Sequence, residues 1–162
     1  MTATVSLTIR SSSPTAKTAV TATHKLMSVS TKGRYALRVM VHFAMRNTEG
    51  YIPLKEIAEA EGISQKYLES IMTTLSKAGF VDAVHGKGGG YRLNRAPSEY
   101  TVGSILKLTE GSLAAVSCTS QGPSACSRST CCQTKPMWVK LDAMIDDFFE
   151  GITLADLLKE ME

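Results

Sequence analysis

The alternation of hydrophobic and polar positions predicts a first helix from Thr31 to Asn47. Apolar side chains recur there at spacings of three and four, which places them on one face: Tyr35, Leu37, Val39, Met40, Phe43 and Ala44. A shorter pattern of the same period follows Pro53, a residue suited to the first turn of a helix, and ends at Gly62. The patterned part of the chain therefore opens with a long and a short amphipathic helix.

A third helical pattern begins after Ser64, a good N-cap residue, and ends at Gly79. Its apolar stripe consists of Tyr67, Leu68, Ile71, Met72 and Leu75. Its opposite face carries polar groups suited to hydrogen bonding: Gln65, Lys66, Glu69, Ser70, Thr73 and Lys77. A short helix, a tight turn with glycine and a longer helix with a polar outer face are typical of a helix-turn-helix, whose second helix enters the DNA major groove.

Residues 80–93 predict a β-hairpin directly after these helices. Two short strands, 80–85 and 91–93, flank a turn made of Gly86, Lys87, Gly88, Gly89 and Gly90. A hairpin in this position is a wing, and its glycines let backbone N–H groups and cations approach phosphates closely. A nucleotide-binding loop is also rich in glycine, but the strand-to-helix context that such a loop requires is absent.

Two further helical segments follow the wing. Residues 101–111 predict a short helix, and residues 134–162 contain a broad apolar stripe: Met137, Trp138, Leu141, Met144, Ile145, Phe148 and Phe149. A helix of this kind covers its stripe either on its own domain or on the matching helix of a second copy. We expect the second copy, because one recognition helix offers too little contact for specific DNA binding.

These patterns predict a mainly α fold with a small β wing. We expect a winged helix-turn-helix DNA-binding domain at 27–110, a cysteine-rich loop at 111–133, and a long C-terminal dimerisation helix with a tail at 134–162. Residues 1–26 are rich in Ser and Thr, contain no acidic residue and show no sustained period, which predicts a disordered extension outside the fold. A dispensable tail or an overextended start before Met27 explains this segment, although a transit peptide has a similar composition.

Composition and charge restrict the class of protein. Of the 162 residues, 43% are hydrophobic and 20% are charged, as in ordinary globular domains, and no apolar run approaches the roughly 20 residues that cross a bilayer. A membrane span is therefore not expected. Residues 27–110 carry eleven Lys and Arg against eight Asp and Glu, whereas residues 111–162 carry four against seven. The basic part suits an anionic partner, and the acidic part suggests another role.

An enzyme is not expected. The three histidines lie in the N-terminal extension, the first helix and the wing: His24, His42 and His85. None has a neighbouring carboxylate and nucleophile from which an acid–base site can be built.

All four cysteines fall in one polar run, CTSQGPSACSRSTCC, at residues 118–132. Cys118, Cys126 and Cys132 follow the spacing C-x7-C-x5-C, with Cys131 adjacent to the last. Structural free cysteines would be dispersed through the core, and disulfides rarely persist in the cytosol, where we expect this chain. Zinc sites commonly use closer cysteine pairs, whereas iron–sulfur clusters accept irregular spacing and bind thiolates. The run therefore favours a cluster or a redox switch.

Four segments together resemble a family of bacterial winged-helix repressors. They are STKGRYALRVM, GISQKYLESIMTTLSKAGFV, HGKGGGYRL and ITLADL, and the resemblance extends from Met27 to the C-terminus. The family includes the iron–sulfur assembly regulator IscR, the nitric-oxide sensor NsrR, the iron regulator RirA and the cysteine-metabolism regulator CymR. The resemblance implies a cytoplasmic homodimer that binds double-stranded DNA and regulates transcription. In many members, three loop cysteines hold an iron–sulfur cluster, 2Fe–2S or 4Fe–4S, that senses iron, redox state or nitric oxide.

Carried over by position, the resemblance assigns Cys118, Cys126 and Cys132 as the cluster and metal ligands. The gap from Cys132 to Trp138 identifies the last of the three, which leaves Cys131 as an extra thiol that could substitute for its neighbour.

The fourth ligand stays unassigned. In the IscR branch it is a histidine three residues after the final cysteine, but Lys135 stands at that position here. In the nitric-oxide branch it is a carboxylate on the first helix, but Arg34 stands there. The cysteine spacing is closest to that of the iron regulator.

For DNA, the resemblance implies base contacts from Lys66 and Glu69. Glu69 can accept from a cytosine amino group, although an exposed helical charge explains it equally well. His85 replaces a wing arginine that probes the minor groove, and a neutral imidazole contributes less there, so the operator is expected to differ. The remaining candidate contacts are Ser64, Gln65 and Tyr67 on the recognition helix, and Lys32, Arg34, Lys77 and Lys87 at phosphates.

Two alternatives remain open. A cluster-free regulator would switch when Cys131 and Cys132, or Cys126 and Cys132, oxidise to a disulfide. An interaction module would instead dock a metabolic enzyme on its acidic half, as the cysteine-metabolism branch implies, although that branch is not expected to carry the cysteine triplet.

Overall fold

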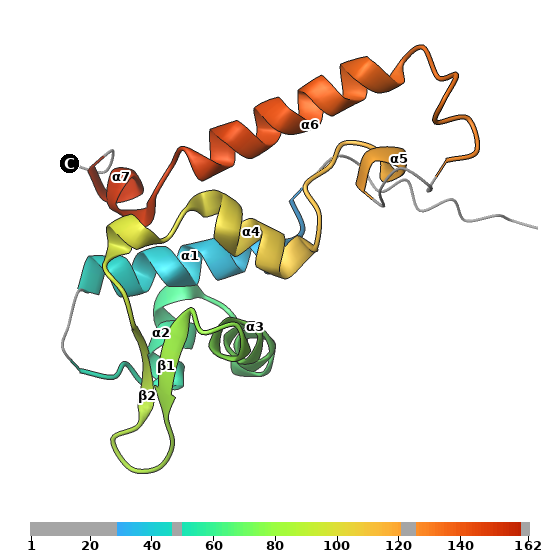
Figure 1. The fold of residues 1–162 in the computed structure, drawn as a ribbon. Coiled ribbons are helices and arrows are strands. Elements are labelled where there is room, and N and C mark those ends of the chain that lie inside the picture. Colours follow the sequence, from blue (N-terminus) through green and yellow to red (C-terminus); the bar gives the residue numbers. More distant parts are fainter. Residues whose placement is uncertain (1–28, 47–49, 121–125, 160–162) are drawn as a thin grey trace, which may run out of the picture.

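The computed structural model describes residues 29–46, 50–120 and 126–159 of the chain, so the predicted disordered extension at 1–26 lies outside the described residues. The single sheet of the described part has two strands, and the remaining elements are helical. This confirms the predicted mainly α fold with a small β wing (Figure 1). The elements in chain order are α1 (Thr31–Arg46), α2 (Leu54–Glu61), α3 (Gln65–Lys77), β1 (Val81–Val84), β2 (Gly90–Leu93), η1 (Pro97–Glu99), α4 (Val102–Glu110), α5 (Ser117–Ser120), α6 (Lys135–Glu150) and α7 (Leu154–Lys159).

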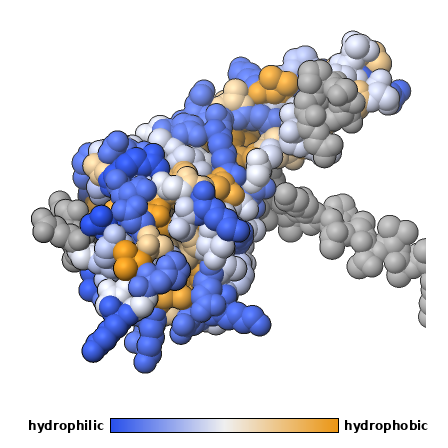
Figure 2. Space-filling model, turned by 60° about the horizontal axis from the view of Figure 1, so that its bottom comes forward, coloured by the Kyte–Doolittle hydropathy of each residue, from blue (hydrophilic) through white to orange (hydrophobic). Residues whose placement is uncertain are grey.

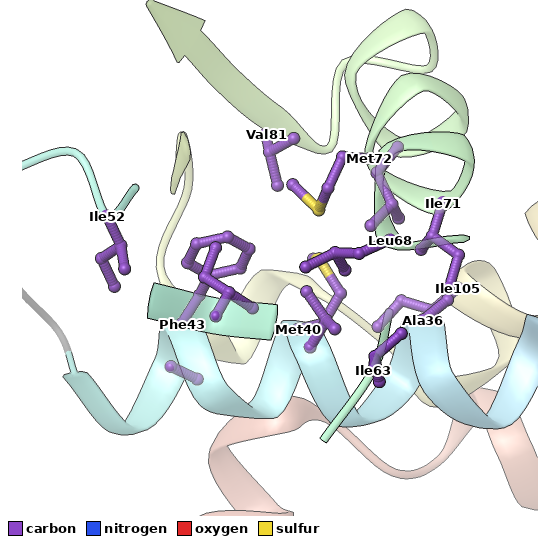
Figure 3. Close-up of a cluster of buried hydrophobic side chains, with 14 of the residues drawn as sticks. Ala36, Met40, Phe43, Ile52, Ile63, Leu68, Ile71, Met72, Val81 and Ile105 are labelled. Carbon is purple, nitrogen blue, oxygen red and sulfur yellow. The ribbon is translucent and has the colours of Figure 1, made fainter. Parts of the chain in front are cut away.

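The core lies between α1 and α3. At the wing end the molecular surface is mostly hydrophilic (Figure 2), whereas hydrophobic side chains gather inside (Figure 3). The side chains labelled in the core view are all buried: Ala36, Met40, Phe43, Ile52, Ile63, Leu68, Ile71, Met72, Val81 and Ile105. The helical spacing that the sequence shows on α1 and α3 is therefore the spacing that buries these residues.

The first strand of the wing is shorter than predicted at both ends. β1 and β2 pair antiparallel along their whole length. Phe80 is not part of β1, because its N–H donates to the carbonyl of Leu75 at 2.9 Å and closes the end of α3, where Gly79 has a φ of 71°. His85 lies beyond β1 because the chain turns at Gly86, whose φ is 100°. Glycine accepts these left-handed conformations without steric cost, so both bounds follow from backbone geometry.

The turn between α2 and α3 is held in place by side chains of α1. Gly62 ends α2 with a φ of 64°. Beside it, Glu61 accepts from Nε of Arg38 at 3.0 Å and pairs with Nδ1 of the buried His42 at 3.0 Å. Ser64 stands at the predicted N-cap position, but its side chain makes no capping hydrogen bond. The contacts of Arg38 and His42 with Glu61, rather than the Ser64 hydroxyl, therefore tie the turn to the domain.

α6 projects from the domain as an arm (Figure 1): its first residues lie far from the domain, its last turn meets α4, and α7 follows against the domain. No residue of α6 is buried. In α7, by contrast, Leu154 is fully buried, and its N–H donates to the carbonyl of Tyr100 at 3.0 Å. The segment predicted as one helix with a tail thus contains two helices, and the second packs on the domain.

Candidate DNA interface and cysteine loop

The outer face of α3 presents polar side chains that the sequence assigns to DNA. Ser64, Gln65, Lys66 and Glu69 are all exposed, while the inner face of the helix is buried. Nε2 of Gln65 donates to a carboxylate oxygen of Glu69 at 3.4 Å, so the two side chains lie along the helix together. This face combines a cation, an amide and a carboxylate, which are the groups that read base edges and phosphates.

Three hydroxyl groups on α3 are already engaged by the helix itself. Ser70, Thr73 and Thr74 donate to carbonyl oxygens three or four residues earlier, at 2.7–3.0 Å. Such a hydroxyl can still accept a hydrogen bond, but its proton is committed to the backbone. Donation from this face therefore falls mainly to Lys66 and Gln65.

Tyr67 differs from its neighbours because its ring is half-buried. It packs edge-on against Tyr35 of α1, with ring centroids 6.0 Å apart and planes at 78°. This contact explains its place in the apolar stripe of the sequence. Its role at DNA stays a prediction.

The tip of the wing carries His85 and Lys87, and both side chains are exposed. The turn between the strands is tight: a Cβ on Gly89 would lie 2.2 Å from the carbonyl oxygen of Val84, so a larger residue does not fit there. The tip projects from the same end of the domain as α3 (Figure 1). This arrangement lets one DNA duplex meet α3 and the wing at once.

The base of the wing is held by Tyr100, which sequence reasoning missed. This residue is fully buried, and its hydroxyl lies 2.9 Å from the carbonyl oxygen of Phe80 and 2.8 Å from Oδ1 of Asn94. The same oxygen accepts from the N–H groups of Asn94 and Arg95 at 3.2 and 3.1 Å. One side chain thus joins both ends of the hairpin. The only feature of the sequence that could have indicated this role is that Tyr100 is a lone aromatic residue in the polar stretch NRAPSEY.

The predicted phosphate contacts on α1 lie beside the recognition helix. Nζ of Lys32 donates to Oγ1 of Thr74 on α3 at 3.1 Å, so its charge sits at the α1–α3 junction. Arg34 is exposed. Lys77, at the end of α3, is exposed as well. A positive edge of this kind attracts an anionic duplex without regard to its sequence.

The cysteines lie near the end of α6 that is remote from α7, away from the wing (Figure 1). Cys118 belongs to α5, a short helix that interrupts the predicted loop, whereas Cys126 and Cys132 lie outside helices. All four thiols are free; Cys131 is exposed and the other three are half-buried. Among the described residues, no three His, Cys, Asp or Glu side chains form a group that could hold a metal ion, and residues 121–125 lie outside the described part.

Cys132 is set apart by its electrostatic surroundings. A hydrogen bond with the Thr134 hydroxyl, at 3.3 Å, is the main cause that lowers the pKa of its thiol, and the Arg128 charge adds a smaller effect. A lowered pKa favours the thiolate, which is the form that binds metals and attacks disulfides. Lys135, at the position of the fourth ligand in the IscR branch, donates instead to the Ser129 hydroxyl.

The outer side of α6 is apolar. Its most exposed hydrophobic side chains are Met137, Met144 and Phe148. None of the described helices has the length and apolar character needed to span a membrane.

Comparison with known proteins confirms the resemblance found in the sequence. The Rrf2 family, described as iron-dependent transcriptional regulators, matches residues 29–160. The HTH-type transcriptional regulator IscR of Aliivibrio salmonicida is 40% identical over 136 residues, which cover 84% of this chain and 80% of that protein. The structure of IscR from T. potens matches with a TM-score of 0.66 at 37% identity, over 83% of this chain and 88% of that one. CymR of B. subtilis, the global cysteine regulator, matches with a TM-score of 0.68 at 30% identity, over 83% and 98%. This chain therefore belongs to the Rrf2 family of winged-helix transcriptional regulators.

Proposed function

We propose that this protein is a homodimeric, DNA-binding regulator whose DNA affinity depends on an iron–sulfur cluster held by Cys118, Cys126 and Cys132. The observation that carries the proposal is the position of these thiols: all three lie outside the core, in the segment that joins α4 to α6. A regulator that represses genes in the cytoplasm would meet its operator through α3 and the wing.

The donor set suits a cluster. Thiolates are the usual ligands of iron–sulfur clusters, and the three thiols are free and partly accessible. The lowered pKa of Cys132 favours the thiolate there. A bound cluster would supply a group whose assembly and loss respond to iron, redox state or nitric oxide. The fourth position would then fall to a group other than Lys135, whose ammonium form cannot coordinate.

The loop is connected to both functional parts of the molecule. The N–H of Ala115, at its start, donates to Oδ1 of Asp142 on α6 at 2.7 Å. At the end of α4, Glu110 accepts from the N–H and the hydroxyl of Ser30, at 3.1 and 2.5 Å, just before α1. Reordering of the loop would therefore act on α6 and on the first turn of α1, whose Lys32 contacts α3. Two states of the loop would bias two arrangements of the recognition helices.

Loss of the cluster in single cysteine variants is the first test. We expect anaerobically purified protein to be brown, with matching iron and acid-labile sulfide, and Cys118→Ala, Cys126→Ala and Cys132→Ala each to lose both. Cys131→Ala is the matched control and should keep them, because that thiol is not among the three ligands. Binding of genomic DNA fragments by cluster-loaded and cluster-free protein is then compared by gel shift.

Two outcomes would contradict this proposal. Colourless protein without iron or sulfide, even after reconstitution, would show that the chain holds no cluster. Equal DNA affinity of the cluster-loaded and cluster-free forms would show that the cluster does not regulate DNA binding. The exposed Cys131 beside Cys132 favours a thiol switch as the second candidate, and a disulfide detected by mass spectrometry in oxidised protein would then support that candidate.

Neutralising Lys66 is expected to weaken specific DNA binding by about 1–3 kcal/mol per half-site, because a cation on the exposed face of α3 can bond to guanine or to a phosphate. Lys159→Ala is the matched control, since Lys159 is an exposed lysine of α7, on the side of the domain away from α3. Fluorescence anisotropy with a duplex enriched from a random library measures both variants. Equal affinity of Lys66→Ala and wild type would show that α3 does not read DNA through this residue.

A further inference from the structure

Three acidic residues form a row along the inner side of α6: Asp142, Asp146 and Glu150. They are spaced by four residues, so they lie one above another on one face of the helix, about 6 Å apart along its axis. Like charges at this spacing destabilise an isolated helix. We therefore expect groups from elsewhere in the fold to offset the repulsion between these three carboxylates.

Each member of this acidic row has a partner on the domain side. Asp142 accepts from the N–H of Ala115 at 2.7 Å. Lys107 of α4 forms ion pairs with Asp146 and, at 2.8 Å, with Oε1 of Glu150. These two carboxylates raise the pKa of Lys107, while hydrogen bonds, first of all from Lys107, lower the pKa of Glu150. Lys107 and Glu150 are thus held in their charged forms.

Glu150 is held by the start of α4 as well. The hydroxyl of Thr101 donates to its Oε2 at 2.6 Å, while Oγ1 of the same residue accepts from the N–H of Ser104 and caps α4. The carboxylate comes this close because Gly103 has no side chain; a Cβ there would lie 2.7 Å from Glu150. A carboxylate at a helix N-terminus also meets the positive end of the helix dipole.

These contacts fix a direction as well as a position. A hydrogen bond between backbone groups ties the segment just after α6 to the start of α4: the Val102 N–H donates to the carbonyl of Ile152 at 2.8 Å. A contact at this one point would allow α6 to rotate relative to α4. Lys107 contacts the helix at Asp146, one turn from that end, and Ala115 contacts it at Asp142, one turn farther, so these points together oppose the rotation. Ion pairs this exposed add little to stability, so their main contribution is to geometry.

We propose that Lys107 and the acidic row set the direction of α6, and thereby the spacing between the two DNA half-sites that a homodimer reads. This inference rests on the proposed dimeric DNA-binding function. Lys107 acts as a positioning residue that does not touch DNA. In a dimer held by α6, any change in the angle between α6 and α4 moves each recognition helix relative to its twin, because α4 packs on α1 and the core. The half-site spacing of an operator has to match the distance between the two recognition helices.

The test compares spacing profiles of Lys107→Met and wild type. Duplexes enriched by the wild-type protein from a random library are remade with the gap between half-sites lengthened or shortened by one base pair. We expect wild type to bind the altered gaps about tenfold more weakly, whereas Lys107→Met should bind all three gaps within about twofold. Lys107→Arg, which can pair with both carboxylates, should restore the wild-type profile.

Lys159→Met is the matched control, because it removes a lysine from an ion pair on α7, outside the acidic row. Glu150→Gln gives a second variant should Lys107→Met fail to fold. A Lys107→Met profile with the same preference as wild type, whatever its overall affinity, would overturn the inference alone. Failure of wild type to enrich any duplex, or enrichment of a single half-site, would overturn the proposed function and the inference with it.

Discussion

Leu68→Ala is expected to lower the free energy of unfolding by about 2–5 kcal/mol. Leu68 is fully buried on the inner face of α3, where it packs among the side chains of α1 and α3 (Figure 3). Truncation to Ala removes three buried carbon atoms and leaves a cavity that its neighbours fill only in part. Urea unfolding followed by circular dichroism measures the effect, at one fixed protein concentration because dimerisation would add to the apparent stability.

Leu113→Ala is the matched control for this loss of stability. Leu113 is half-buried in the segment that follows α4, outside the core cluster, so its truncation should cost clearly less. The midpoint of Leu68→Ala should fall while the slope of the unfolding curve stays the same. A decrease in the free energy of unfolding of less than about 1 kcal/mol would contradict the packing of α3 on α1, because truncating a fully buried leucine to alanine costs more than that.

The double substitution of Met144 and Phe148 by Glu is expected to convert the proposed dimer into a monomer. These side chains are 59% and 63% exposed in the single chain and lie four residues apart on the outer side of α6, opposite the acidic row. In a dimer the new carboxylates would be desolvated without a partner, which costs several kcal/mol per charge. Size-exclusion chromatography with light scattering measures the mass.

DNA binding should fall together with the dimer. A monomer presents one recognition helix, so we expect an affinity loss of about 100-fold or more on a two-half-site duplex. Met45→Glu is the matched control: Met45 is 57% exposed on α1, and it is not part of α6. A double variant that remains a dimer would show that another surface joins the two copies, and the role of α6 as the dimerisation helix would be wrong.

Local patterns predicted most of the fold. The helices α1, α2, α3, α4 and α6 lie where their apolar spacing places them. The predicted end of α1 at Asn47 lies outside the described residues, and α6 ends at Glu150, well inside the predicted segment 134–162. The wing was predicted from its turn, because glycines with positive φ mark chain reversals directly in the sequence. The polar face of α3 was also readable, since the side that is not apolar must face outward.

Features that join distant residues escaped the same reasoning. Tyr100 has no periodic neighbours, yet its hydroxyl organises the base of the wing. The acidic row of α6 looks like an ordinary charged face until Lys107 is found beside it. The tail beyond α6 showed the family motif ITLADL but no sign that α7 would bury Leu154 against the core.

The sequence by itself determined the order of the elements, the buried face of each helix and the residue types offered to DNA and to a cluster. These properties depend on backbone periodicity and side-chain chemistry within a few residues, and both are written in the local pattern. Only the tertiary structure decided that α7 returns to α1, that Lys32 reaches α3 and that Lys107 pairs with α6. Lys32 and Thr74 are 42 residues apart in the chain, and Lys107 and Glu150 are 43 residues apart. Such pairs form only when packing of the core brings their elements together.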